Sequence, residues 1–159
     1  MIRRAAPPPL GLVLVRVAAG VVLFGAGRGF IGAVAPDGPA IAALVESTSA
    51  TASGPVAWWG RVVLLENPDA LAFLWPWLLT LTGAALFLGL LVRPAGYLAS
   101  FAMLHGMVYG RAETTLLHAL LAVMALGCAV ALAGRRLGLD ALVGESLPSG
   151  LTWTRAERR

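Results

Sequence analysis

Four long apolar stretches, separated by short charged segments, constrain the fold of this chain more than any other feature of its sequence. They cover approximately residues 10–34, 70–92, 95–111 and 115–134. A helix needs about 20 apolar residues to cross a hydrocarbon core about 30 Å thick, and each stretch is near or above the lower end of that range. A soluble domain of 159 residues has too little polar surface to cover four such segments. The sequence therefore predicts a polytopic membrane protein.

The composition agrees with this prediction. The chain is 58% hydrophobic and 13% charged, against roughly 45–50% and 25% for an average soluble domain. In a soluble protein the net charge of +4 would suggest a nucleic-acid partner, but here membrane orientation explains it, so we expect no nucleic acid. The single Cys128 excludes an intramolecular disulfide.

The distribution of arginine predicts the orientation in the membrane. With a cytoplasmic N-terminus, only Arg28, Arg61 and Arg111 lie outside. The other arginines then lie on the cytoplasmic side: Arg3, Arg4, Arg16, Arg93, Arg135, Arg136, Arg155, Arg158 and Arg159. This bias follows the positive-inside rule. We therefore expect both termini to be cytoplasmic and the chain to cross the plasma (inner) membrane four times.

The predicted fold is all-α, an integral membrane four-helix bundle. Residues 1–140 form a single transmembrane domain, and residues 141–159 form a basic cytoplasmic tail. The start of the chain also resembles a cleavable signal peptide, with small residues at 33–35. Arg16 within the apolar run, Arg28 at its end and Pro36 after the cleavage position argue against cleavage.

The connection between the first two spans, residues 35–67, is the only long loop, and it is predicted to lie outside. Its second half, Gly54–Leu65, is predicted to be a short helix in the membrane interface, with Trp58 and Trp59 at headgroup level. This helix could be an interfacial anchor or a lid above a binding site. The preceding stretch, Glu46–Ser53, is predicted to be polar and flexible.

Ionisable side chains at membrane depth usually face a bundle interior or a cavity. His105 and Tyr109 lie one turn apart on the predicted helix 95–111, and His118 lies on the helix 115–134. At 1.5 Å per residue, both histidines lie about 6–9 Å below the outer surface. Four charged residues reach the same level and complete the candidate ligand or quinone pocket: Arg28, Glu66, Arg111 and Glu113.

Each of these residues also has a simpler explanation. The four charged residues lie where interfacial charges commonly anchor a helix, and an intramembrane histidine is often a hydrogen-bond donor between helices. Two histidines do not complete a metal site, since four ligands are usual. No metal or haem is therefore predicted.

Three segments of the chain resemble the DoxX family of small four-helix membrane proteins, which includes the DoxD-like subunits of thiosulfate:quinone oxidoreductases. In the first helix the similarity lies in Leu14–Gly20 and Gly25–Arg28, and in the second it lies in Thr80–Gly83 and Leu88–Arg93. After the fourth helix, Gly134–Asp140 is similar to the terminal element of the family. The similarity covers most of residues 10–140.

The resemblance implies a DoxX-like quinone-facing or membrane-anchoring subunit of an oxidoreductase, with quinone as its cofactor. Its partners would be the lipid bilayer and other protein subunits or further copies of itself. Many family members carry Glu at the position of Thr80 and Lys at the position of Arg28, and Thr cannot relay protons. The alternative is a non-catalytic membrane scaffold that assembles soluble partners. A small-solute carrier is disfavoured, because no inverted repeat is detectable.

Overall fold

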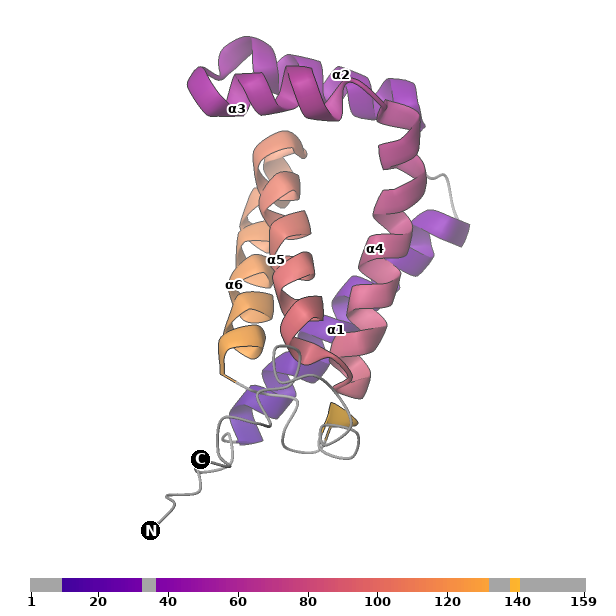
Figure 1. Ribbon diagram of the computed structural model, residues 1–159, viewed down its shortest axis with the longest axis vertical. Helices are drawn as coiled ribbons and strands as arrows, with labels where there is room; N and C mark the ends of the chain where they lie inside the picture. Colours follow the sequence, from indigo (N-terminus) through magenta and orange to yellow (C-terminus); the bar gives the residue numbers. More distant parts are fainter. Residues whose placement is uncertain (1–9, 33–36, 132–137, 141–159) are drawn as a thin grey trace, which may run out of the picture.

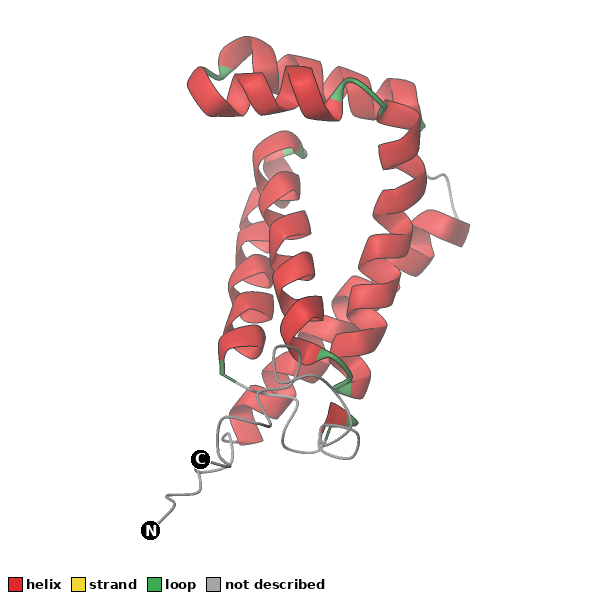
Figure 2. Ribbon diagram, in the orientation of Figure 1, coloured by secondary structure: helices red, strands yellow, loops and turns green. Residues whose placement is uncertain are grey.

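The computed structural model describes residues 10–32, 37–131 and 138–140, and every regular element in them is helical (Figure 2). The predicted tail, residues 141–159, lies outside the described residues. The elements are α1 (Leu10–Gly32), α2 (Gly38–Thr51), α3 (Gly54–Trp59), the π-helical turn η1 (Gly60–Leu64), α4 (Pro68–Leu88), α5 (Val92–Tyr109), the 3₁₀ turn η2 (Ala112–Thr114) and α6 (Thr115–Val130). The all-α prediction is confirmed for these residues.

The long helices α1, α4, α5 and α6 correspond to the four apolar stretches. α1 packs on α4 and α6, and α5 packs on α4 and α6 (Figure 1). The core between them contains large residues of α1 and α4, such as Leu23 and Leu86, and mostly small residues of α5 and α6. Small residues allow α5 and α6 to approach closely as an antiparallel pair. They are Ala95, Ala99, Ala102, Ala122, Ala125 and Cys128.

Glycines bring the backbones of α1 and α4 into direct contact. Gly20 packs against the backbone of Phe87, where an added Cβ would lie 2.5 Å from the Phe87 nitrogen. Gly83 makes the reciprocal contact with the backbone of Phe24. Without a hydrophobic driving force between helices in lipid, close packing of this kind is a main source of helix association.

Within the described residues, three helical segments are long and apolar enough to cross a membrane: Leu10–Ile31, Pro68–Leu88 and Ala112–Val130. They indicate a membrane protein, and their apolar surfaces are compatible with contact to a lipid bilayer. Among the described helices, α5 is a special case. It has 18 residues but is not one of these three segments, and its sequence includes Arg93, Tyr97 and His105.

Several predicted boundaries were wrong. The second apolar helix ends at Leu88, not at residue 92, because Gly89 caps it in the left-handed conformation, with φ of 68°. The third begins at Val92, not at 95, so that Pro94 lies in its first turn, where proline is tolerated. The last ends at Val130, and residues 132–134 of the predicted span lie outside the described part of the chain. Residues 33–34 of the first span also lie outside it.

The helix expected at Gly54–Leu65 is confirmed as α3 continued by η1, but the flexible stretch expected at Glu46–Ser53 is wrong. Most of that stretch is the end of α2. The carboxylate of Asp37 caps the start of this helix by accepting the Ala40 N–H at 2.9 Å. We call α2, α3 and η1 together the cap. Figure 1 shows α2 and α3 lying across the ends of α4 and α5, at the end of the molecule opposite the start of α1.

Candidate functional site

The cap contacts α5 through the predicted site residue His105. The indole Nε1–H of Trp59 donates to His105 Nε2 at 2.9 Å. The other ring nitrogen, Nδ1, lies 2.9 Å from the Phe101 carbonyl oxygen. The rings of Phe101 and Tyr109 flank the imidazole, with centroid distances of 4.2 Å and 6.3 Å. His105 therefore sits in an aromatic cluster that joins α3 to α5.

Tyr109 makes a second link between α5 and the cap. Its hydroxyl donates to the Val56 carbonyl at 2.6 Å, and its side chain is buried with Val45 and Leu64. Gly60 permits this approach, because a Cβ there would lie 3.1 Å from the tyrosine ring. His105 and Tyr109 thus share one helix face, as their spacing predicts, and that face meets the cap.

His118 lies on α6 and contacts a different part of α5. Its ring packs against Gly106, where an added Cβ would come within 2.6 Å of the imidazole. The Nδ1 atom of this partly exposed residue is itself buried and has no hydrogen-bond partner. Among the described contacts, His105 bonds to Trp59 and Phe101, while His118 contacts α5 through Gly106.

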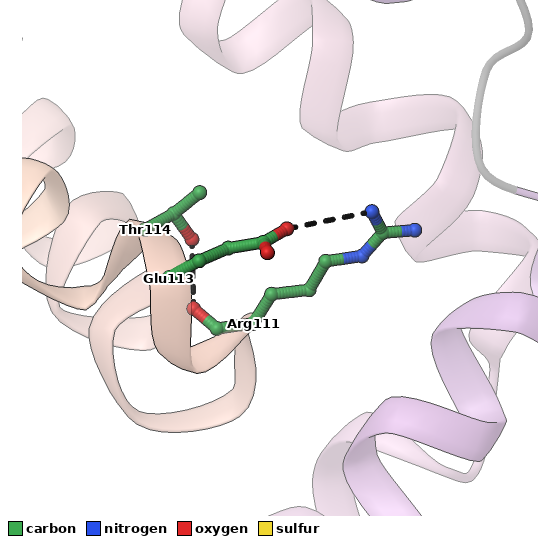
Figure 3. Close-up of polar contacts among 3 residues, drawn as sticks. All are labelled: Arg111, Glu113 and Thr114. Carbon is green, nitrogen blue, oxygen red and sulfur yellow. Dashed lines mark hydrogen bonds and ion pairs between the residues drawn. The ribbon is translucent and has the colours of Figure 1, made fainter.

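The four predicted charged residues are exposed. Arg111 and Glu113 form an ion pair at 3.7 Å in the turn before α6, with side chains 74% and 72% exposed (Figure 3). In the same turn the Thr114 hydroxyl donates to the Arg111 carbonyl at 2.9 Å. Arg28 and Glu66 form no hydrogen bond or ion pair with any other described residue. Of the seven predicted residues, the structure places His105 and Tyr109 together beside the cap and pairs Arg111 with Glu113 in an exposed turn.

Sequence reasoning did not identify Trp59 as a partner of His105. The sequence predicts that Trp58 and Trp59 both lie at headgroup level. Trp58 fits that interpretation, since it is 57% exposed, while Trp59 turns inward. Neighbouring residues of a helix point to different sides of it. An exposed Trp58 could therefore have indicated that the indole of Trp59 points inward.

A second polar cluster lies at the opposite end of α5, and sequence reasoning did not propose it as a site. The Asp140 carboxylate accepts hydrogen bonds from the backbone N–H groups of Leu91 at 2.7 Å and Val92 at 3.0 Å. Leu91 has a φ of 49°, which is unusual for a residue with a side chain. A carboxylate at a helix N-terminus also complements the helix dipole. Asp140 therefore fixes the start of α5 from 48 residues further along the chain.

Arg16 belongs to this second cluster. It is 1% exposed, its guanidinium lies beside Gly89, and it is attracted electrostatically by Asp140. A buried cation in an apolar helix needs such a partner. The arginine that interrupts the first apolar stretch is thus a packed element of the interior at this end.

The contact between the cap and α5 gathers an indole N–H, an imidazole and a phenol hydroxyl, and each of them already has a hydrogen-bond partner within the described part of the chain. Within the described part of the chain, no group of three His, Cys, Asp or Glu side chains could hold a metal ion.

No family model, no curated protein and no solved structure matches this chain.

Proposed function

We propose that the chain is a four-helix transmembrane bundle with α5 as the fourth span. At 1.5 Å per residue, the 18 residues of α5 extend about 27 Å, close to the thickness of a hydrocarbon core. The start of α1, the α4–α5 link and Asp140 lie at one end, and the cap lies at the other (Figure 1). An even number of crossings accounts for this arrangement. The end with Arg16 and Asp140 is the cytoplasmic one.

The exposed apolar side chains support this placement. Many large residues of the long helices are more than about 40% exposed: Leu14, Phe24, Phe73, Leu81, Phe101, Leu116 and Val123. In water such a surface would favour aggregation, whereas hydrocarbon covers it without cost. Trp58 on the cap then reaches the headgroup region, as tryptophan commonly does.

For the function, the chain is a DoxX-like subunit that anchors an oxidoreductase to the plasma membrane and faces its quinone. The observation that carries this proposal is the aromatic cluster of Trp59, Phe101, His105 and Tyr109, located where α5 meets the cap. Quinone sites commonly combine aromatic surfaces with hydrogen-bond donors near the membrane surface. Beside the cluster, Leu98 and Leu104 of α5 present an exposed apolar surface for an isoprenoid tail.

The residues of the aromatic cluster fit a quinone headgroup only if the Trp59–His105 hydrogen bond opens. A quinone carbonyl needs a hydrogen-bond donor, and in this structure Trp59 already donates to His105 and Tyr109 to Val56. Opening the Trp59–His105 contact would free the indole N–H for a headgroup. His118, with one buried ring nitrogen without a partner, is a second polar group on the neighbouring helix. A bound quinone would supply the electron-carrying chemistry, and these residues would hold it.

The experiment is extraction and quantification of quinone from protein purified in mild detergent. We expect quinone with the wild-type chain and loss of it in His105→Ala and Trp59→Phe. Tyr97→Phe is the matched control, because Tyr97 is an exposed aromatic residue of the same helix and should retain quinone. Wild-type protein that carries no quinone, even when quinone is added back, would contradict the proposal.

One observation favours a second function, that of a non-catalytic scaffold. Both ring nitrogens of His105 are already engaged within the chain, which is the arrangement expected of a structural contact. In this case the protein would anchor soluble subunits, or associate with further copies of itself, without binding quinone. Co-purification of a stoichiometric partner, with no quinone and with unchanged recovery in His105→Gln, would support the scaffold.

A further inference from the structure

The cap is joined to α5 by two side-chain hydrogen bonds of different chemistry. One runs from the Trp59 indole to the His105 imidazole at 2.9 Å, and the other from the Tyr109 hydroxyl to the Val56 carbonyl at 2.6 Å. Both cap residues belong to α3. The tyrosine bond needs no titratable acceptor, whereas the indole bond depends on the protonation state of a histidine.

The hydrogen bonds of His105 determine which nitrogen carries its proton. A backbone carbonyl only accepts, so Nδ1, which lies 2.9 Å from the Phe101 oxygen, must carry the hydrogen. An indole N–H only donates, so Nε2 must have its lone pair available for Trp59. The contact therefore requires the neutral imidazole.

We propose that the Trp59–His105 bond is a proton-sensitive latch: protonation of His105 breaks this bond and loosens the attachment of α3 to α5, where the Tyr109–Val56 bond remains. The imidazolium carries hydrogen on both nitrogens, so its Nε2–H would face the indole N–H of Trp59, donor against donor. The bond to Phe101 would persist, since Nδ1 donates in both states. The rings of Phe101 and Tyr109 would then flank a cation, which aromatic faces stabilise. The inference goes beyond the proposed function and holds whether or not the chain binds quinone.

The other ionisable groups near the latch do not take part in it. On the cap, Arg61 donates to the Ser49 carbonyl at 3.0 Å. On α5, Tyr109 is committed to Val56, and on α6, His118 packs against Gly106. The carboxylates of the neighbouring segments, Glu46, Glu66 and Glu113, are exposed. Among the described contacts, no carboxylate bonds to His105.

The connection between α2 and α3 favours movement of α3 and η1 once the Trp59–His105 bond is broken. Two residues, Ala52 and Ser53, link the helices, and Gly54 follows with a φ of 61° and open space around it. The next segment, η1, is a π-helical turn, a type of turn often found at functional sites. Movement of α3 and η1 would uncover Val45 of α2, which is 3% exposed beneath them.

The first test observes the latch bond itself. In full-length protein labelled with ¹⁵N-tryptophan in micelles, the indole signal of Trp59, assigned by Trp59→Phe, should move as the pH falls from about 8 to about 5. The shift should vanish in His105→Gln, whose side chain is neutral at every pH. It should persist in His118→Gln, which removes the other of the two histidines. A Trp59 signal that does not move in the wild type, or that still moves in His105→Gln, would overturn the latch.

The second test measures whether α3 and η1 loosen over Val45 of α2. In a Cys128→Ala background, maleimide labelling of Val45→Cys is compared with that of Glu46→Cys, the exposed neighbour on the same helix. The ratio of the two rates removes the pH dependence that the thiols share, and the same ratio in His105→Gln controls for a difference between their pKa values. Loss of one hydrogen bond should raise this ratio about fivefold at low pH, which corresponds to about 1 kcal/mol. An unchanged ratio, or an equal rise with His105→Gln, would refute this loosening.

Neither experiment uses quinone. A protein that carries quinone but shows no pH response would keep the proposed function and remove the latch, and the reverse result would do the opposite.

Discussion

The two ends of α5 are secured by different chemistry. At its start, the Asp140 carboxylate accepts two backbone N–H groups, beside a buried Arg16. At its other end, neutral groups of Trp59 and Tyr109 join the helix to the cap. Hydrogen bonds to an ionised group are roughly twice as strong as those between neutral groups. The comparison indicates that the start of α5 is held more firmly than the end that meets the cap. We call the start of α5 its fixed end and the end at the cap its releasable end.

The largest effect is expected from Asp140→Ala. The substitution removes two charge-assisted hydrogen bonds, one of which holds Leu91 in its unusual backbone conformation. It also removes the carboxylate that attracts the buried Arg16. We expect the free energy of unfolding in detergent to fall by about 3 kcal/mol. Denaturation followed by circular dichroism in mixed micelles measures it.

The matched control is Asp37→Ala, which removes a single exposed N-cap bond from the start of α2. It should lower the free energy of unfolding by about 1 kcal/mol. If Asp140→Ala lowered the free energy of unfolding no more than Asp37→Ala does, Asp140 would not hold the start of α5 more firmly than an ordinary N-cap.

A smaller loss at the same end is expected from Gly89→Ala. Gly89 has a φ of 68°, and a Cβ there would lie 2.6 Å from the Gly138 Cα and 2.7 Å from Arg16 Nη1. The left-handed conformation alone costs about 1–2 kcal/mol for a residue with a Cβ, so we expect a loss of about 2 kcal/mol in the same unfolding assay. Gly127→Ala is the control, since open space surrounds that helical glycine and alanine favours helix there. An equal loss in both variants would argue against close packing at Gly89.

Much of this fold is readable from the sequence, because apolar runs and local caps are local signals. The four long helices follow from the apolar stretches, and Pro68 is the first residue of α4, a position that proline favours. α2 was missed because its second half, Glu46–Thr51, is rich in Ser and Thr, which favour turns in isolation. Burial of Val45 and Ser49 one turn apart against Gly60 stabilises it as a helix. This contact depends on a segment eleven or more residues away and is not a local signal.

The site was less predictable than the fold for a geometric reason. Counting along a helix gives depth, and it correctly places His105 and Tyr109 one turn apart on a face that meets another element. The position of a residue along the helix axis does not show in which direction around that axis its side chain points. Counting predicts Arg28 and Glu66 at the same level as the histidines, but the structure shows both side chains exposed. The bond between Trp59 and His105 joins residues 46 apart in the chain, and only the packing of the cap brings them together.

At the releasable end, Tyr109→Phe should cost less than either change at the fixed end. The variant keeps the ring in its buried site and loses one neutral hydrogen bond to Val56. We expect a loss of about 1 kcal/mol in the free energy of unfolding. Tyr97→Phe on the same helix is exposed and should change nothing measurable. A Tyr109→Phe loss as large as that of Asp140→Ala would mean that the cap is held as firmly as the start of α5.

The smallest effect is expected from Arg111→Ala, in the turn that follows α5. Its ion pair with Glu113 spans 3.7 Å between side chains that are both about three-quarters exposed (Figure 3). Water screens such pairs, and their contribution is commonly within about 0.5 kcal/mol of zero. Unfolding of Arg111→Ala at low and high salt should therefore match that of the wild type. A clear loss at low salt, absent at high salt, would show that charge secures this end of α5 as well, and the contrast between its two ends would then disappear.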